Sequence, residues 1–204
     1  MPLKSTHLAW LILLPALFSC QKEPVKEAAA PALTESRRQE IIKQGGEASS
    51  ALLASLGPKL KAALTAGGPV HALTVCQQLA QPSTKEVAAG MAGITLSRVS
   101  LKPRNPENAP DQLDTEVLTA WHKQVADHGK ATSDEVRMKD GETAVFYRPI
   151  LIEEVCLKCH GDPGTFSAAL SEQLAKLYPE DRATGYSKGE LRGAFRVEFP
   201  AEAD

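Results

Sequence analysis

The chain has 204 residues, of which 43% are hydrophobic and 24% are charged. This balance is typical of an ordered globular domain and excludes a chain that is disordered throughout. Lys and Arg number 23 against 25 Asp and Glu, and aromatic residues make up only 5%. The chain therefore lacks the basic surface and the stacking side chains of a nucleic-acid-binding protein, and we expect no nucleic-acid partner.

The first 19 residues predict a signal peptide. Lys4 precedes the apolar run Leu8–Phe18, which is too short for a membrane-spanning helix of about 20 residues. The run ends in Leu17-Phe18-Ser19-Cys20, which resembles the lipobox of bacterial lipoproteins and predicts lipidation of Cys20. Phe18 is bulkier than that motif usually carries, so cleavage by an ordinary signal peptidase is the alternative.

Residues 20–35 are predicted to be a tether that follows the lipid anchor. The segment is rich in Ala, Pro, Lys and Glu and has no apolar period. Gln21 follows the cysteine in place of an aspartate, which by analogy with enteric bacteria indicates sorting to the outer membrane. We therefore expect a periplasmic protein that is lipid-anchored at the outer membrane.

Helices are expected in the first part of the remaining chain. From Ser36 to about Leu64, apolar side chains recur at helical spacing. Gly45-Gly46 and Gly57-Pro58 interrupt this stretch, so one kinked helix and two shorter helices are both consistent with the pattern. Gly67-Gly68-Pro69 predicts a break, and Pro69 would begin a second helix that reaches about Ala80. Cys76 falls on the apolar stripe of that helix, so we expect it to point inward.

The later part of the chain alternates between strand and helix patterns. The residues around 103–110 favour turns. The stretch Thr143–Ile152 is apolar on both faces and is expected to be a central strand. Further strands are expected at 94–101 and 190–199, and further helices at 114–127 and 167–177. This order predicts an α+β domain with a small antiparallel sheet flanked by helices.

Cys156-Leu157-Lys158-Cys159-His160 has the C-x-x-C-H signature of covalent c-type haem attachment. Thiols three positions apart lie on neighbouring faces of one helical turn, where each can add to a haem vinyl group. His160 is then directed at the iron. Haem of this kind is attached after export, so the signal peptide and the motif support one another. The motif occurs once, which predicts one haem c and excludes a chain of haems.

Three other interpretations of these cysteines compete with haem. A zinc site would need about four ligands, and no second pair is obvious. A redox-active dithiol usually occurs in a βαβ context, which is missing here. A structural disulfide between Cys156 and Cys159 would make the protein a non-haem structural lipoprotein.

Cys76 is the one thiol left without an assigned role. The common role of a free cysteine is that of a small buried hydrophobe; the functional alternative is a thiolate that binds the iron opposite His160. Rival ligands are His71, Met91, His122, His128 and Met138. The propionates of a haem would pair with arginines, because a guanidinium group binds a carboxylate through two hydrogen bonds. The candidates are Arg98, Arg148 and, as first choice because of its turn-rich setting, Arg104.

Four segments carry a resemblance when taken in order: Leu73–Cys76, Arg98–Pro110, Cys156–Gly161, and Asp181–Tyr186 leading into Gly189–Ala194. Together they resemble the single-haem c-type cytochrome module with a PAS-like fold that was first described in cyanobacteria and long catalogued as a domain of unknown function. The resemblance covers about residues 36–199. It implies a PAS-like haem domain over residues 36–204, and an iron held by His160 and Cys76.

The implied ligand pair has functional consequences. A thiolate donates electron density and stabilises ferric iron, so a low reduction potential is expected. With both axial positions filled, catalysis is disfavoured and we expect no enzyme. The PAS-like resemblance favours a redox or gas sensor, in which reduction or a small gas ligand displaces Cys76 and a partner protein receives the signal. The alternative is a low-potential electron carrier between redox partners.

Overall fold

The computed structural model describes residues 33–91, 93–129 and 133–200. The predicted signal peptide, Cys20 and nearly all of the predicted tether lie outside these residues. Among the helices of the described residues, none is long and apolar enough to cross a membrane.

The first element is a single long helix with one kink, α1 (Glu35–Ala89). The Thr34 side chain accepts a hydrogen bond from the Arg37 amide and caps its start. The glycine and proline pairs at 45–46 and 57–58 do not interrupt it. The chain departs from helical geometry only at Gly67 and Gly68, and Gly68 has a φ of +67° and a ψ of −163°, a conformation that is essentially restricted to glycine. The predicted break is therefore confirmed.

The second segment of α1 is longer than predicted. It continues to Ala89 rather than ending near Ala80, and it contains Pro82. A proline inside a helix removes one backbone hydrogen bond. Val87 and Ala88 nevertheless pack against the main core, and their burial favours continuation of the helix past the proline. Local propensity alone cannot reveal this packing.

Four antiparallel strands form one sheet: β1 (Thr95–Val99), β2 (Glu135–Lys139), β3 (Thr143–Leu151) and β4 (Leu191–Phe199). Their order is β1-β4-β3-β2. The central position predicted for the strand at 143–152 is confirmed. Strand β2 was not predicted, because its EVRMK sequence is largely charged and buries only Val136. The predicted α+β, PAS-like architecture is confirmed.

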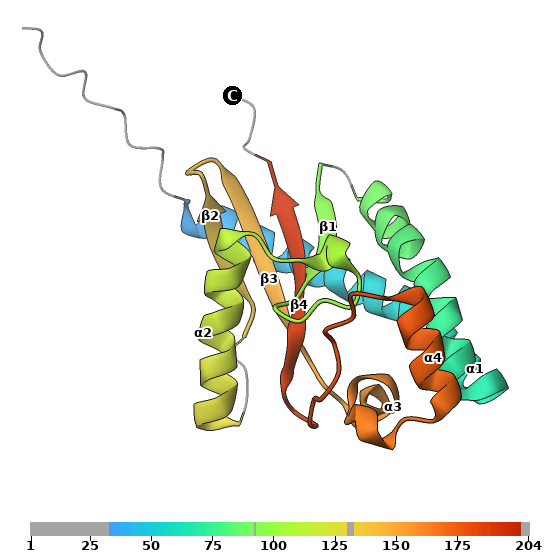
Figure 1. Cartoon of the computed structure of the whole chain (residues 1–204). Helices are drawn as coiled ribbons and strands as arrows, with labels where there is room; N and C mark the ends of the chain where they lie inside the picture. The colour runs from blue at the N-terminus through green and yellow to red at the C-terminus, as the bar shows by residue number, and fades with distance from the viewer. Residues whose placement is uncertain (1–32, 92, 130–132, 201–204) are drawn as a thin grey trace, which may run out of the picture.

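Helices cover both faces of the sheet (Figure 1). The first segment of α1 packs on one face, where Ile41 and Leu52 share a core cluster with Phe146. Helix α2 (Gln112–His128) covers the other face, where Trp121 packs with Tyr147. Alternate residues of β3 point to opposite faces of the sheet. Because helices cover both of these faces, both faces of β3 are apolar.

The remaining helices are short and lie at one end of the molecule. The turn η2 (Glu154–Cys156) leads into α3 (Leu157–His160), and α4 (Ala168–Leu177) packs on the second segment of α1 through Leu73, Leu170 and Leu174. Single turns, η1 (Pro106–Asn108) and η3 (Pro163–Thr165), complete the loops. This arrangement places α3 opposite the second segment of α1 (Figure 1).

Candidate functional site

A cavity of about 500 Å³ lies between both segments of α1, the ends of β1, β3 and β4 that face them, and the η2–α3 turn. Its volume is within the range of about 300–1,000 Å³ that is usual for small-molecule and cofactor sites. Much of its wall is apolar and comes from α1: Leu53, Leu56, Leu60, Leu64, Leu73, Val75 and Leu79. A cavity of this size and lining suits a large, mainly apolar ligand.

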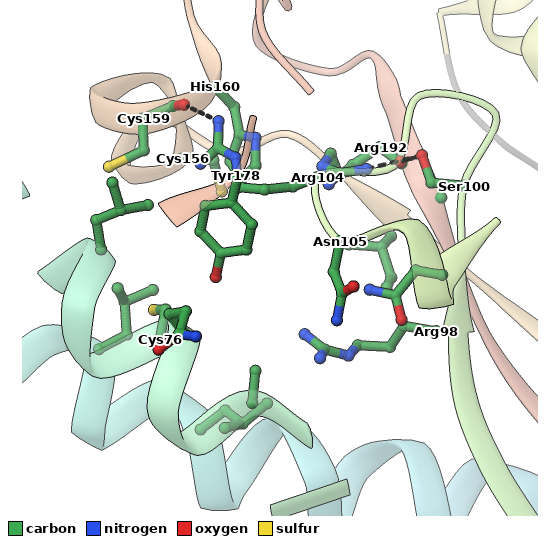
Figure 2. Close-up of a pocket in the computed structure, with 18 of the residues that line it drawn as sticks. Cys76, Arg98, Ser100, Arg104, Asn105, Cys156, Cys159, His160, Tyr178 and Arg192 are labelled. Carbon is green, nitrogen blue, oxygen red and sulfur yellow. Dashed lines mark hydrogen bonds between the residues drawn. The ribbon is translucent and has the colours of Figure 1, made fainter. Parts of the chain in front are cut away.

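The two cysteines and the histidine of the C-x-x-C-H motif lie on one wall of this cavity, and Cys76 lies on the other (Figure 2). Cys156, Cys159 and His160 come from the single turn of η2 and α3, whereas Cys76 comes from the second segment of α1. The thiols of Cys76, Cys156 and Cys159 are free in this structure. These four of the five residues predicted to bind the cofactor are thus gathered around one space, and the fifth, Arg104, also lines it.

The rival ligands do not line the cavity. His71, His122, His128 and Met138 are absent from its wall, and Met91 lines a separate shallow depression beside α1. Within the described ranges, no group of three or more His, Cys, Asp or Glu side chains is arranged to hold a metal ion. An iron already held by a porphyrin would need only two protein ligands. Of the iron ligands weighed from the sequence, Cys76 and His160 are the ones that line this cavity.

A hydrogen bond at Nδ1 fixes the orientation of the His160 ring. Nδ1 lies 2.6 Å from the Ala183 carbonyl oxygen. A carbonyl can only accept, so the proton is on Nδ1 and the lone pair is on Nε2. The backbone also holds this segment, because the Tyr186 amide donates to the His160 carbonyl at 2.9 Å and the Gly185 amide donates to the Gly161 carbonyl at 2.8 Å. His160 is thereby held in the tautomer that a metal-binding Nε2 requires.

The electrostatic surroundings favour neutral His160. Burial, followed by the positive charges of Arg104 and Arg192, lowers the pKa of His160 well below its usual value. Burial raises the pKa of Cys76, although the nearby Arg98 and Arg104 act in the opposite direction. The site thus offers a neutral imidazole on one wall and, on the other, a thiol close to two cations.

Arg104 has a different set of partners from the one the sequence led us to expect. Its guanidinium pairs with Asp181 through Nε at 3.1 Å and Nη2 at 3.0 Å. The same Nη2 donates to the carbonyls of Cys159 at 2.6 Å and Ala183 at 3.2 Å. Arg104 lines the cavity, but these contacts tie it to the protein backbone behind His160.

The other two arginine candidates differ in position. Arg98 lines the cavity, and its buried Nε has no hydrogen-bond partner among the described residues. Figure 2 shows its side chain directed toward the space between the walls. Arg148 is absent from the cavity wall and pairs instead with Asp134 at 2.6 Å beside α1. The prediction that Arg148 is a propionate partner therefore finds no support in its position.

Sequence reasoning missed several residues of the site. Tyr178 and Arg192 line the cavity, and Arg192 donates to the Ser100 hydroxyl at 2.7 Å. Asp181 and Ala183 hold Arg104 and His160. The segment Asp181–Tyr186 contributed to the family resemblance, but nothing in its residue types indicated that one of its carbonyls would meet the motif histidine.

Comparison with known proteins places this arrangement in a family. The family model described as Tll0287-like matches residues 22–200. The chain belongs to the Tll0287-like family. Among solved structures, this Tll0287-like chain is similar to the crystal structure of the cyanobacterial heme-protein Tll0287, with a TM-score of 0.57 and 24% sequence identity over 83% of this chain and 99% of that chain. At this identity the similarity shows a shared fold. No match was found among curated proteins.

Proposed function

We propose that this chain is an exported, lipid-anchored c-type cytochrome with one haem, which acts as a redox or gas sensor. The observation that carries the proposal is the placement of Cys156, Cys159 and His160 across one apolar cavity from Cys76. Membership of the Tll0287-like family supports it, because a solved structure with the same fold is described as a heme-protein. The anchor would be a lipid on Cys20, in the periplasm at the outer membrane.

The residues around the cavity fit a covalently attached haem. Cys156 and Cys159 supply thiols at the spacing that such attachment requires. His160 presents Nε2 as a lone-pair donor, because Nδ1 is engaged by the Ala183 carbonyl. The unpartnered Nε of Arg98 would gain a partner if a carboxylate of the cofactor lay against it. Arg98 therefore replaces Arg104 as our first candidate for a propionate partner.

Cys76 would be the second axial ligand. When bound, a haem supplies one-electron exchange and a site for small gases. Arg98 and Arg104 favour a thiolate at Cys76 and oppose the effect of burial. With a ligand on each side of the iron, we expect no open catalytic position and propose no enzyme activity.

The sensor interpretation depends on where Cys76 sits. The second segment of α1, which carries it, follows the kink at Gly67 and Gly68 and packs on α4 through Leu73. Release of Cys76 on reduction or gas binding would free this segment to shift against α4. A protein partner that contacts α1 or α4 would then receive the signal.

A low-potential electron carrier is the second candidate. Two cavity-lining residues, Leu53 and Val155, are the large hydrophobic side chains that remain exposed in the described part of the chain, at 61% and 46%. An apolar, exposed rim at a cofactor edge suits brief contact with a redox partner. This feature favours electron transfer without requiring Cys76 to move.

Substitution of Cys76 tests the proposed ligand set. We expect Cys76→Ala to change the ferric absorption and electron spin resonance spectra of the native protein, since a thiolate ligand would be lost. His71→Ala, which removes a rival ligand outside the cavity, is the matched control and should leave both spectra unchanged. A spectrum that Cys76→Ala does not alter would remove Cys76 from the coordination sphere.

The ferrous protein distinguishes the two candidate functions. Loss of the Cys76 bond on reduction, or binding of CO at modest concentration, would support sensing. A Cys76 bond that persists in the ferrous state without CO binding would support electron transfer instead.

A further inference from the structure

The loop that follows α4 and the C-x-x-C-H turn are joined through one guanidinium group. Arg104 Nη2 donates to the Cys159 carbonyl at 2.6 Å and to the Ala183 carbonyl at 3.2 Å. Arg104 is only 9% exposed, and Asp181 holds its Nε and Nη2 at 3.1 and 3.0 Å. Asp181 also accepts from the Ala183 amide at 2.8 Å. The guanidinium is thus held against two backbone carbonyls: that of Cys159, which precedes His160 in the chain, and that of Ala183, which contacts the His160 ring.

The Ala183 carbonyl oxygen is shared. It accepts from His160 Nδ1 at 2.6 Å and from the cationic Arg104 Nη2 at 3.2 Å. A carbonyl oxygen has two lone pairs and can accept both bonds. Donation from a cation draws electron density from the oxygen, and this weakens it as an acceptor for the imidazole N–H. The charge on Arg104 therefore acts on His160 through one atom.

We propose that Arg104 is a positioning residue that sets the electron-donating strength of His160 through the shared Ala183 carbonyl, and that Asp181 moderates this effect. The inference rests on the proposed function, in which His160 binds the iron. An acceptor at Nδ1 that binds its proton strongly makes the imidazole a better donor to the metal and favours ferric iron. Arg104 opposes this by weakening the acceptor, and its positive charge also favours the ferrous state. Asp181 offsets part of that charge.

Two substitutions in the same ion pair separate electrostatic tuning from simple support. Arg104→Gln removes the cation and leaves Asp181, so the ferric state is favoured and the reduction potential falls. Asp181→Asn leaves the cation uncompensated, so the potential rises. Both variants break the same contact and loosen the same loop. A purely structural role would therefore move both potentials in the same direction.

The test is the midpoint potential of the full-length haem protein and its variants, followed by absorption during reductive titration. We expect Arg104→Gln to shift the ferric–ferrous equilibrium about tenfold toward ferric, which is about 59 mV for a one-electron couple, and Asp181→Asn to shift it in the opposite direction. Arg104→Lys keeps the charge and should shift the potential by less than half as much as Arg104→Gln.

Hydrogen exchange supplies a readout that does not depend on the iron. Arg104→Lys cannot reproduce the forked contact with Asp181 and two carbonyls. We therefore expect faster amide exchange at Gly185 and Tyr186, whose amides donate to Gly161 and His160. Unchanged exchange in Arg104→Lys would show that Arg104 does not position this segment and would overturn that part of the proposal.

The outcomes are separable from those of the proposed function. Potentials that shift in the same direction, or do not shift, in a protein that carries covalent haem would overturn this inference alone. If Arg104→Gln does not fold, the comparison of Asp181→Asn with the unmodified protein decides. A higher midpoint potential in Asp181→Asn supports the inference, and a lower or unchanged midpoint potential overturns it. A wild-type protein without covalent haem would overturn the proposed function and this inference together.

Discussion

At the residue scale, the three arginines near the cavity differ in how well their guanidinium groups are satisfied. Arg104 is paired with Asp181 and two carbonyls, and Arg192 donates to Ser100 and to the Lys102 carbonyl. Of these three, Arg98 alone has a buried nitrogen that finds no partner in the described part of the chain. From the sequence, Arg104 was the first choice ahead of Arg98 and Arg148. Its partners Asp181 and Ala183 lie in a loop far along the chain, and the sequence alone could not reveal them.

Arg98→Gln should destabilise the protein only when the cofactor is attached. In the haem protein we expect a loss of about 1.5–3 kcal/mol in the free energy of unfolding, the usual value of a hydrogen bond to a charged group. In a haem-free Cys156→Ser, Cys159→Ser background, the same change should be neutral or stabilising, since it removes a buried group that lacks a partner. Thermal unfolding of the four proteins measures this, and equal destabilisation in both backgrounds would contradict the assigned role.

At the element scale, α1 shows what a sequence pattern can and cannot reveal. The break at Gly67 and Gly68 could be predicted, because the two glycines and Pro69 are local signals. The extension through Pro82 could not, since it depends on packing of Val87 and Ala88 against a core assembled from distant strands. The edge strand β2 was missed for a related reason: its charged sequence forms a strand only by pairing with β3.

Gly45 is expected to be essential to the contact between α1 and the sheet. A Cβ atom at this position would overlap the ring of Phe146. We expect Gly45→Ala to lower the free energy of unfolding by about 1–3 kcal/mol, as is usual for overpacking. Gly90→Ala is the matched control at the end of the same helix, where an added Cβ comes no nearer than 3.5 Å to another atom, and it should be close to neutral. Chemical denaturation measures both, and a neutral Gly45→Ala would show that the helix can move away from Phe146 at little cost.

At the scale of the whole molecule, a polar network joins α2 to the sheet on the side away from α1. Buried Asp114 accepts from Tyr147 at 2.6 Å and from Arg196 at 2.7 Å. Arg196 also contacts Glu198 at 2.6 Å, and Lys139 contacts Asp111 at 3.1 Å. These contacts join α2 and its N-cap to three strands, β2, β3 and β4, and help fix how α2 sits on the sheet.

This network predicts loss of stability in acid. Burial alone would raise the pKa of Asp111 and of Glu198, but hydrogen bonds and the nearby cations outweigh it and hold both pKa values below their ordinary values of 3.8 and 4.5. Carboxyls with a lowered pKa stabilise the folded state above their unfolded pKa, and this stability is lost as the pH falls through the folded pKa. The free energy of unfolding should therefore decline from about pH 5 downward.

Denaturant unfolding at a series of pH values checks the acid prediction. Glu198→Gln should show a shallower decline than the unmodified protein, because one of the two carboxyls no longer titrates. A free energy of unfolding that stays constant between pH 7 and pH 3.5 would contradict the account.

The sequence predicted the architecture and the main members of the site better than it predicted their connections. The motif at 156–160 and the family resemblance led to Cys156, Cys159, His160 and Cys76, which the structure gathers around one cavity. The carbonyl that fixes His160 and the carboxylate that fixes Arg104 belong to the Asp181–Tyr186 loop. Contacts between segments so far apart in the chain leave no signal in residue type or spacing, so they required the structure.

The central claim is that one haem is covalently attached through Cys156 and Cys159. The most direct test is the intact mass of the mature, exported protein after denaturation and acid-acetone extraction, which remove a haem that is not covalently bound. We expect the mass of the chain and its lipid plus one haem, and a colourless Cys156→Ala, Cys159→Ala variant without that addition. A wild-type protein whose mass is that of polypeptide and lipid alone would contradict the account.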